Sequence, residues 1–269
     1  MSCPAPTQAP SDNPKKSAAD ALIDCLVTLI CWTWFIFGFL FFFSFPYVAC
    51  ALFTRNPERH FQRLNHQFFQ IFFWIVEATS PRQKIIIDER IGTIRSSVIV
   101  CNHLSYLDPL LLIALFQQQK TIVKARFFTT PIFGWMIRKS GYLPATSEGR
   151  YSGLVVQHME TMESYLKKGG NLFIFPEGTR SRDGKIGKLN KGAFQITRMC
   201  KAPLYVLQLH NTNRLFTPGK FFFNTRQKTT ISVNIIEHIV PDYHNNPPTT
   251  TELLQQVQQI YTANENVTI

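Results

Sequence analysis

An uncharged stretch near the N-terminus constrains the fold of this 269-residue chain more than any other feature. No Asp, Glu, Lys or Arg occurs from Leu26 to Phe53. The part up to Phe45 alone is long enough to cross a hydrocarbon core as a helix. Pro46 is expected to divide the stretch into one long and one short piece. Because the apolar part is too long for an ordinary signal peptide, the sequence favours a membrane-associated helix over a cleaved leader.

A second helix is predicted directly after this stretch, from Glu58 to Val76. Its apolar residues recur at helical spacing, and arginines occupy the opposite side. The apolar positions are Phe61, Leu64, Phe68, Ile71, Phe72 and Ile75, and the arginines are Arg55, Arg59 and Arg63. Either the first helix spans the bilayer and the second lies in the interface, or both dip in from one face as a hairpin. Basic residues flank the stretch on both sides, including Lys15-Lys16, so the positive-inside rule does not decide.

The length allows one catalytic domain and an anchor. Residues 1–18 are rich in Pro, Ser, Ala and Lys and are predicted to be disordered. Residues 19–80 would form the membrane-anchoring helices, and residues 81–269 the catalytic domain.

The net charge and the cysteine content limit the classes of partner that we expect for this protein. The net charge is +11 and the pI is near 9.5, which suits anionic lipid, the phosphates of coenzyme A or an acidic carrier protein. Nucleic acid is not an expected partner, because the basic residues are spread out and the phenylalanines cluster in apolar runs. The 6 cysteines show neither metal-ligand spacing nor a disulfide framework, so reduced thiols and no metal are expected.

Short apolar strands alternate with helices after residue 81. This order predicts an α/β fold with a largely parallel sheet covered by helices, preceded by the N-terminal two-helix membrane-associated segment. The expected strands are Ile85–Asp88, Val98–Cys101, Thr121–Ala125, Leu172–Phe175, Leu204–Leu209 and Ile231–Ile236. The longer expected helices are Arg150–Lys168, Lys191–Cys200 and Thr251–Ala263.

The first candidate motif is Asn102-His103-Leu104-Ser105-Tyr106-Leu107-Asp108-Pro109. It follows a predicted strand, and Asp108-Pro109 reads as a helix start with Asp108 as N-cap. A turn between strand and helix would bring His103 and Asp108 together. His103 would then be a base that removes a proton from a hydroxyl, and Asp108 would fix its tautomer. The alternative is that Asp108 only caps a helix and His103 is a structural residue.

Two other groups near this pattern are weighed against it. Cys101 would lie on the same strand face as His103, yet a cysteine in an apolar run is usually a small core residue. His158 and Glu163 have the same spacing as His103 and Asp108, but they fall in the middle of a predicted helix. Residues five apart on one helix point away from each other, so no role is assigned to this pair.

The second candidate motif is Phe175-Pro176-Glu177-Gly178-Thr179-Arg180-Ser181, at the end of a predicted strand. Arg180 offers a planar fork of donors suited to phosphate. Glu177 is expected to accept from Arg180, a backbone N–H or a substrate hydroxyl. Lys185, Lys188 and Lys191 add positive charge downstream. Unless this is an ordinary charged turn, the two motifs together indicate a hydroxyl-activating base beside an anion-holding loop, which suits acyl transfer to a phosphorylated alcohol.

The two motifs and their order resemble the glycerolipid acyltransferase family typified by 1-acylglycerol-3-phosphate acyltransferases. Segments at Lys124–Phe128, Pro131–Trp135, Lys191–Phe194 and Ala202–Leu204 also resemble family blocks. The resemblance runs from about Lys84 to Ile236. It implies that His103 and Asp108 form the catalytic dyad, that Glu177, Gly178, Thr179 and Arg180 form the acceptor-phosphate loop, and that Lys124 is a further positive group at the substrate.

Two departures from the family pattern concern the acceptor. The family often has an arginine where Thr146 stands, and Arg150 is the nearest substitute. A second proline is common where this chain has Tyr205. The first departure bears on the acceptor head group, and neither changes the dyad.

The resemblance implies a membrane-bound acyltransferase with its active site facing the cytoplasm. It would move a fatty acyl group from acyl-CoA or acyl carrier protein to the free hydroxyl of 1-acylglycerol-3-phosphate, giving phosphatidic acid. The acyl donor is a co-substrate, and no cofactor is expected. One alternative is the same chemistry on another lysophospholipid or a lyso-aminolipid. The other is a non-catalytic lipid-binding membrane protein, which would have no need of a base.

Overall fold

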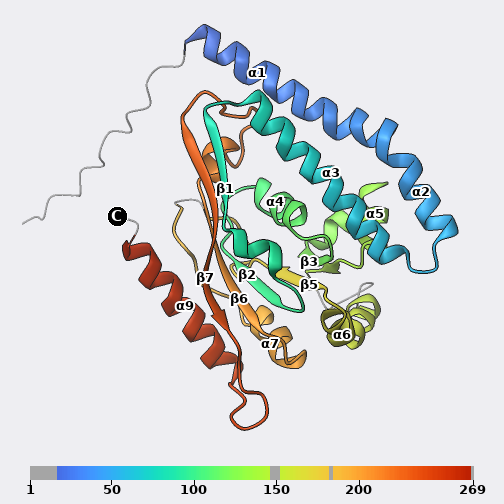
Figure 1. Cartoon of the computed structure of the whole chain (residues 1–269), viewed down its shortest axis with the longest axis vertical. Helices are drawn as coiled ribbons and strands as arrows, with labels where there is room; N and C mark the ends of the chain where they lie inside the picture. The colour runs from blue at the N-terminus through green and yellow to red at the C-terminus, as the bar shows by residue number, and fades with distance from the viewer. Residues whose placement is uncertain (1–16, 146–151, 182–183, 268–269) are drawn as a thin grey trace, which may run out of the picture.

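The computed structural model describes residues 17–145, 152–181 and 184–267. Most of the predicted disordered segment 1–18 therefore lies outside the described residues, and so do Thr146 and Arg150. Figure 1 shows a twisted sheet with helices on both faces and a long N-terminal helix across one side.

The sheet has seven strands in the order β1-β7-β6-β2-β5-β3-β4. All neighbouring strands are parallel except β6 and β7, which are antiparallel. The strands are β1 (Gln83–Ile87), β2 (Val98–Cys101), β3 (Gln119–Val123), β4 (Leu143–Pro144), β5 (Asn171–Ile174), β6 (Leu204–His210) and β7 (Thr229–Ile239). The predicted α/β class with a largely parallel sheet is confirmed.

Side chains of the central strands alternate between two apolar cores, as the pleat requires. Ile99 and Phe173 face the core shared with α3 (Pro57–Thr79) and α4 (Leu107–Leu115). Val100 and Leu172 face the opposite core. Helices α6 (Ser152–Lys167), α7 (Gly192–Met199) and α9 (Thr250–Val267) cover that second face. Short connections complete the chain: η2 (Glu89–Thr93), η3 (Ala125–Thr129), α5 (Phe133–Lys139) and α8 (Thr212–Leu215).

The N-terminal helix runs without a break through α1 (Ala18–Thr33), the π-helical η1 (Trp34–Phe43) and α2 (Ser44–Phe53). The expected division at Pro46 is therefore wrong. Pro46 lies in the first turn of α2, directly after the π-helical segment, where a missing N–H costs little. Among the described residues, one helix, Ala18–Phe53, is long and apolar enough to cross a membrane.

Helix α3 returns along this first helix and forms a hairpin with it (Figure 1). Aromatic rings fill the contact, with Trp34 stacked on Phe68 at 5.3 Å and Tyr47 packed on Phe61 at 5.0 Å. The predicted second helix is confirmed.

Polar contacts also join α3 to β3 and to the end of α5. Glu58 of α3 forms a 2.9 Å ion pair with Lys120 of β3, whose side chain is 2% exposed. Gln62 Nε2 donates to the carbonyl of Ser140 at 2.9 Å, and Asn65 Nδ2 donates to Ser140 Oγ at 2.9 Å. Helix α3 is therefore fixed in position relative to the strands that carry the candidate site.

Candidate active site

The crossover connections that leave β2 and β5 run in opposite directions across the sheet. From β2 it crosses through α4 to β3 on one side, and from β5 it crosses through α7 to β6 on the other side. Since α4 and α7 cover opposite faces, a crevice opens at the carboxyl ends of these two strands. The first motif follows β2 and the second follows β5, so the fold brings the two motifs together there.

The dyad contact is present. His103 Nδ1 lies 2.9 Å from Asp108 Oδ2, and the carboxylate is completely buried while the imidazole is 17% exposed. With Nδ1–H donating to Asp108, the lone pair of Nε2 is free to accept a proton. The two side chains therefore have the geometry of an oriented general base.

Asp108 is not the N-cap that the sequence predicts. Helix α4 begins two residues earlier than expected, at Leu107, and Tyr106 occupies the N-cap position. The Asp108 carboxylate instead turns back over the preceding loop and accepts the backbone N–H groups of Leu104 at 2.5 Å and Ser105 at 2.7 Å. These bonds fold the tight turn that places His103 against the acid.

A threonine far along the chain completes the shell of Asp108. Thr212, at the start of α8, donates its hydroxyl to Asp108 Oδ1 and is 1% exposed. The carboxylate thus receives donors on both oxygens, which fixes its orientation toward His103. No motif marks Thr212, and it lies 104 residues after Asp108, so sequence reasoning missed it.

Asn102 holds the motif to the neighbouring strand. Its Nδ2 donates to the carbonyl of Leu209 at 2.9 Å, and its Oδ1 accepts the N–H of Leu209 at 2.7 Å. The side-chain amide therefore continues the β2–β6 ladder after β2 has ended. On the other side, the Phe175 ring stacks on the His103 imidazole with centroids 4.3 Å apart.

The buried Glu177 carboxylate binds backbone N–H groups next to the candidate site. The residue is 8% exposed. It accepts the His103 N–H at 2.9 Å and the Gly187 N–H at 3.0 Å. Burial raises the pKa of Glu177 above its ordinary value, while these two hydrogen bonds oppose the rise. Of the three partners that the sequence suggests, the structure shows the backbone N–H, and this carboxylate does not line the cavity described below.

Arg180 lies over an aromatic ring at the edge of the crevice. Its guanidinium carbon is 3.6 Å from the centroid of Tyr106, in a cation–π contact. Its buried Nη1 has no hydrogen-bond partner among the described residues. Gly178, two residues earlier, has a φ of +68°, a conformation that favours glycine and turns the loop sharply after β5.

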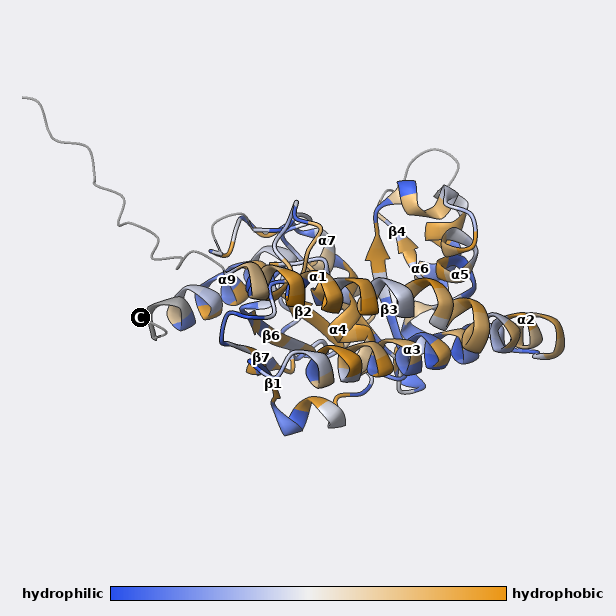
Figure 2. Cartoon of the chain, turned by 90° about the horizontal axis from the view of Figure 1, so that it is seen from above, coloured by the Kyte–Doolittle hydropathy of each residue, from blue (hydrophilic) through white to orange (hydrophobic). Residues whose placement is uncertain are grey.

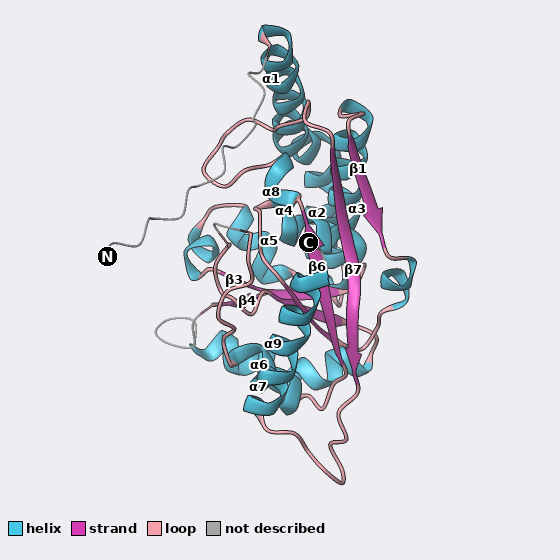
Figure 3. Cartoon of the chain, turned by 90° about the vertical axis from the view of Figure 1, so that its left-hand side faces the viewer, coloured by secondary structure: helices cyan, strands magenta, loops and turns pink. Residues whose placement is uncertain are grey.

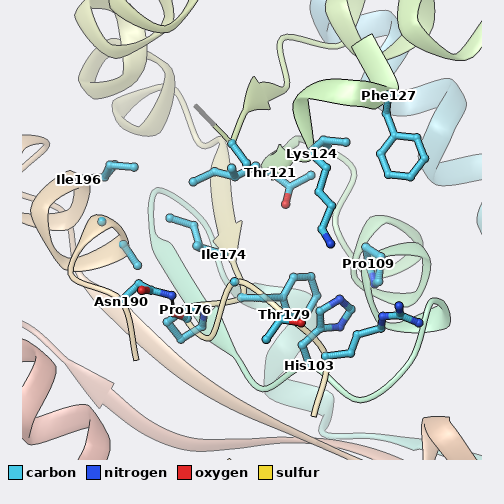
Figure 4. A pocket seen from close by; sticks show the side chains of 18 of the residues that line it. His103, Pro109, Thr121, Lys124, Phe127, Ile174, Pro176, Thr179, Asn190 and Ile196 are labelled. Atoms are coloured by element: carbon cyan, nitrogen blue, oxygen red, sulfur yellow. Dashed lines mark hydrogen bonds between the residues drawn. The ribbon is translucent and has the colours of Figure 1, made fainter. Parts of the chain in front are cut away.

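A cavity of about 470 Å³ joins these groups. His103, Lys124, Gly178, Thr179 and Arg180 all line it. Figure 4 shows the Lys124 side chain extending into the cavity from the wall opposite His103 and Thr179. Arg126 also lines the cavity, which therefore presents an imidazole and three cationic side chains to one small molecule. Of the residues that the sequence predicts at the site, Asp108 and Glu177 lie behind this wall.

A second, apolar cavity of about 480 Å³ shares part of this lining. Tyr106, Pro109 and Phe127 line both cavities. From there the second cavity extends to Phe35 and Phe39 in the N-terminal helix. The crevice that contains His103 and the N-terminal hairpin are thus both adjacent to one apolar cavity.

The remaining candidate residues from the sequence do not line the 470 Å³ cavity. Cys101 is fully buried, and burial together with the charges of Asp108 and Glu177 raises its pKa well above the ordinary value, so it is not a reactive thiolate. His158 is in the middle of α6, as expected, and burial together with the charge of Lys120 lowers its pKa to about 4. Lys185, Lys188 and Lys191 are exposed and do not line the 470 Å³ cavity.

Comparisons with known proteins agree with this arrangement. Residues 82–209 match the profile of the Acyltransferase family. The chloroplastic 1-acyl-sn-glycerol-3-phosphate acyltransferase BAT2 of Brassica napus is 36% identical over 122 residues, which are 45% of this chain and 35% of that protein. The corresponding chloroplastic enzyme LPAT1 of Arabidopsis thaliana is 35% identical over 46% of this chain and 34% of its own length. The match thus spans about a third of each of these relatives.

The fold is also similar to a solved structure. The crystal structure of the 1-acyl-sn-glycerophosphate acyltransferase PlsC from Thermotoga maritima superimposes with a TM-score of 0.65 at 20% identity. The superposition covers 91% of this chain and 95% of the other. It therefore includes most of the N-terminal hairpin as well as the sheet.

Proposed function

We propose that this protein, whose residues 82–209 match the profile of the Acyltransferase family, transfers a fatty acyl group from a thioester to the free hydroxyl of 1-acylglycerol-3-phosphate. The product would be phosphatidic acid. The observation that carries the proposal is the shared cavity, in which the imidazole of the His103–Asp108 pair and the guanidinium of Arg180 face the same space. The relatives BAT2 and LPAT1 are 1-acyl-sn-glycerol-3-phosphate acyltransferases by name, which supports the proposal.

The chemistry follows from the orientation of the imidazole. Nε2 of His103 removes the proton of the acceptor hydroxyl as its oxygen attacks the thioester carbonyl. The tetrahedral intermediate collapses, the carbon–sulfur bond breaks, and the leaving thiolate takes the proton from the imidazolium. Asp108 stabilises the imidazolium between these steps. The substrate oxygen does the work of a catalytic serine, so no acyl-enzyme forms.

Two cations would hold the acceptor phosphate. Arg180 offers a planar pair of donors and Lys124 a mobile point charge, and both line the cavity, as does Arg126. They would bind the charged end of the acceptor while His103 acts on its hydroxyl. Glycerol 3-phosphate carries these two groups on neighbouring carbons, which suits one cavity of this size.

The apolar parts of the substrates need a second region. The 480 Å³ cavity next to the site is lined largely by aliphatic and aromatic side chains and reaches the hairpin. It supports the proposal that acyl chains enter from a membrane to which the hairpin is bound. We expect the donor to be acyl-CoA or acyl carrier protein and the site to face the cytoplasm, where the cysteines stay reduced.

A direct assay tests the proposal. Full-length protein in phospholipid vesicles is given acyl-CoA or acyl carrier protein with 1-acylglycerol-3-phosphate, a choline lysophospholipid or a lyso-aminolipid. We expect transfer to the first acceptor, and a loss of at least about a hundredfold for His103→Ala. Cys101→Ser is the matched control, because this thiol lies beside the dyad but is buried, and it should keep most of the rate.

The same assay separates the alternatives. Preference for another lysophospholipid would transfer the proposal to that acceptor. Absence of turnover with every acceptor would favour a non-catalytic lipid-binding protein. Activity that survives His103→Ala but not Cys101→Ser would contradict the proposed base.

A further inference from the structure

Two phenylalanines project from the loop between α8 and β7. Phe221 is 57% exposed and Phe222 is 52% exposed, whereas the next residue, Phe223, is buried in the core. Large aromatic side chains rarely remain this exposed next to one another unless they contact a partner or a membrane. The loop lies beside α1 (Figures 1 and 3).

The loop is fastened to the inner side of α1 by buried polar contacts. Thr28 Oγ1 accepts the N–H of Phe223 at 2.9 Å. Asp24 Oδ1 accepts both the N–H and the hydroxyl of Thr225, at 2.8 and 2.7 Å. Asp24 and Thr28 are 3% and 0% exposed. The loop is therefore held in place, and both of these polar residues of α1 face inward.

The outer side of α1 is apolar and meets the same loop. Leu22, Leu26 and Leu29 are 61%, 51% and 53% exposed. Trp32, which is 38% exposed, stacks on Phe221 with ring centroids 5.6 Å apart and planes 6° apart. Figure 2 shows that most residues of α1 and α2 are hydrophobic. Phe221 and Trp32 thus make the loop and the helix one continuous apolar surface.

We propose that Phe221 and Phe222 insert into the same lipid leaflet as the outer side of α1, so that the loop is a second membrane contact. This inference rests on the proposed membrane-bound function. With the loop fastened to its inner side, α1 lies along the membrane surface, as interfacial helices do.

The chemistry of the loop fits a bilayer with anionic head groups. The segment 217–223 contains no Asp or Glu, and the exposed Lys220 directly precedes the two phenylalanines. A lysine can keep its ammonium among phosphates while neighbouring aromatic rings enter the acyl region. Tryptophan is also typical of this interface, and Arg226 is paired with Asp20 at 2.8 Å on the side that faces α1.

The loop also reaches the catalytic turn. Phe216, at its beginning, stacks on Phe223 with centroids 4.7 Å apart, and its carbonyl accepts the Ser105 hydroxyl at 2.8 Å. Ser105 donates its N–H to Asp108. Lipid contact at Phe221 and Phe222 therefore anchors a segment that is two contacts away from the dyad.

Photochemical labelling of the full-length protein tests the inference. The protein is bound to vesicles of phosphatidylcholine and phosphatidylglycerol that contain a phospholipid with a diazirine in its acyl chain. After irradiation, trypsin releases the loop as the short peptide Phe221–Arg226, separate from residues 17–55 and 229–269. We expect label on the loop peptide and on residues 17–55. Peptide 229–269 carries Val240, which is 71% exposed and directly follows the last residue of β7, and it should remain unlabelled.

The other outcomes are distinct. Label on residues 17–55 without label on the loop peptide would overturn the inference and leave the proposed membrane association intact. Label on neither would overturn both. Equal label on 229–269 would show that contact is unspecific and would also contradict the inference.

A variant pair gives a second measurement. Phe221→Ser combined with Phe222→Ser should lower the partition coefficient for these vesicles by at least about tenfold. Val240→Ser removes a comparably exposed apolar side chain elsewhere and should leave it unchanged. Equal partitioning of the double variant and Val240→Ser, with unchanged circular dichroism, would contradict the inference.

Discussion

The guanidinium carbon of Arg180 lies 3.6 Å from the centroid of the Tyr106 ring. This contact joins the loop after β5 to the residue that precedes α4 and thus links the two sequence motifs. The ring holds the plane of the guanidinium without using its N–H donors, and Nη1 has no hydrogen-bond partner in the described part of the chain. Tyr106 therefore fixes the position of a group that remains able to bind an anion.

Removing the ring should weaken acceptor binding and leave the chemical step intact. We predict that Tyr106→Leu raises KM for the phosphorylated acceptor about three- to tenfold, with kcat changed less than about twofold. Tyr106→Phe keeps the ring and should behave like the wild type. Steady-state kinetics in the Arg180→Ala background provide the control, because the Tyr106→Leu effect should disappear there. A full effect in that background would mean that Tyr106 acts independently of Arg180.

Thr212 should influence the rate through Asp108. We predict that Thr212→Val lowers kcat about five- to thirtyfold, because a buried carboxylate loses one of its donors. KM for the acceptor should change little, and Thr212→Ser should restore most of the rate. The pH profile of kcat is measured alongside, since a positioning role should move its acidic limb whereas a general loss of folded protein would not. Equal kcat for Thr212→Val and wild type would exclude the role.

His158 should make the protein less stable in mild acid. Burial and the charge of Lys120 lower the pKa of His158 to about 4 in the folded state. In mild acid, the unfolded chain therefore binds a proton at this histidine that the folded chain does not bind. Stability associated with this group is present above the ordinary pKa of histidine and is lost as the pH falls toward 4. The unfolding free energy of the wild type should fall between pH 7 and pH 5. We predict that this fall is smaller in His158→Gln by up to about 2 kcal/mol.

The measurement is denaturant unfolding of both proteins in detergent at the two pH values. The compared quantity is the change in unfolding free energy between the two pH values. A destabilisation by the substitution that is the same at both pH values therefore cancels. Identical pH dependence of the two proteins would show that folding does not lower the pKa of His158, which would contradict the prediction.

Much of the fold follows from local sequence pattern. The bounds of β2 are predictable because Val98–Cys101 is an apolar run between polar residues, and α3 follows from its helical apolar spacing. The direction of β7 is not predictable in this way. It pairs antiparallel with β6 because the connection of residues 211–228 contains only the short α8 and no long crossover helix.

In the candidate site, too, the local motifs are predictable from the sequence and the contacts between distant segments are not. The sequence places His103 and Asp108 in one turn and Arg180 in another, because each motif is local. The partners of these residues are tertiary. Thr212 reaches Asp108 from the start of α8, after β6, and Glu177 turns to the His103 backbone. No spacing rule carries that information, since hydrogen bonds between distant segments depend on the register of β2, β5 and β6.

The central claim is that one cavity holds a base for the acceptor hydroxyl and a separate cationic group for the acceptor phosphate. The most direct test compares Arg180→Ala and His103→Ala with 1-acylglycerol-3-phosphate and with 1-acylglycerol, the same acceptor without its phosphate, both supplied at high concentration. We predict that His103→Ala lowers kcat/KM at least about a hundredfold with both acceptors. Arg180→Ala should lower it about ten- to a hundredfold with the phosphorylated acceptor and less than about threefold with the other. Equal losses for Arg180→Ala with the two acceptors would contradict the account.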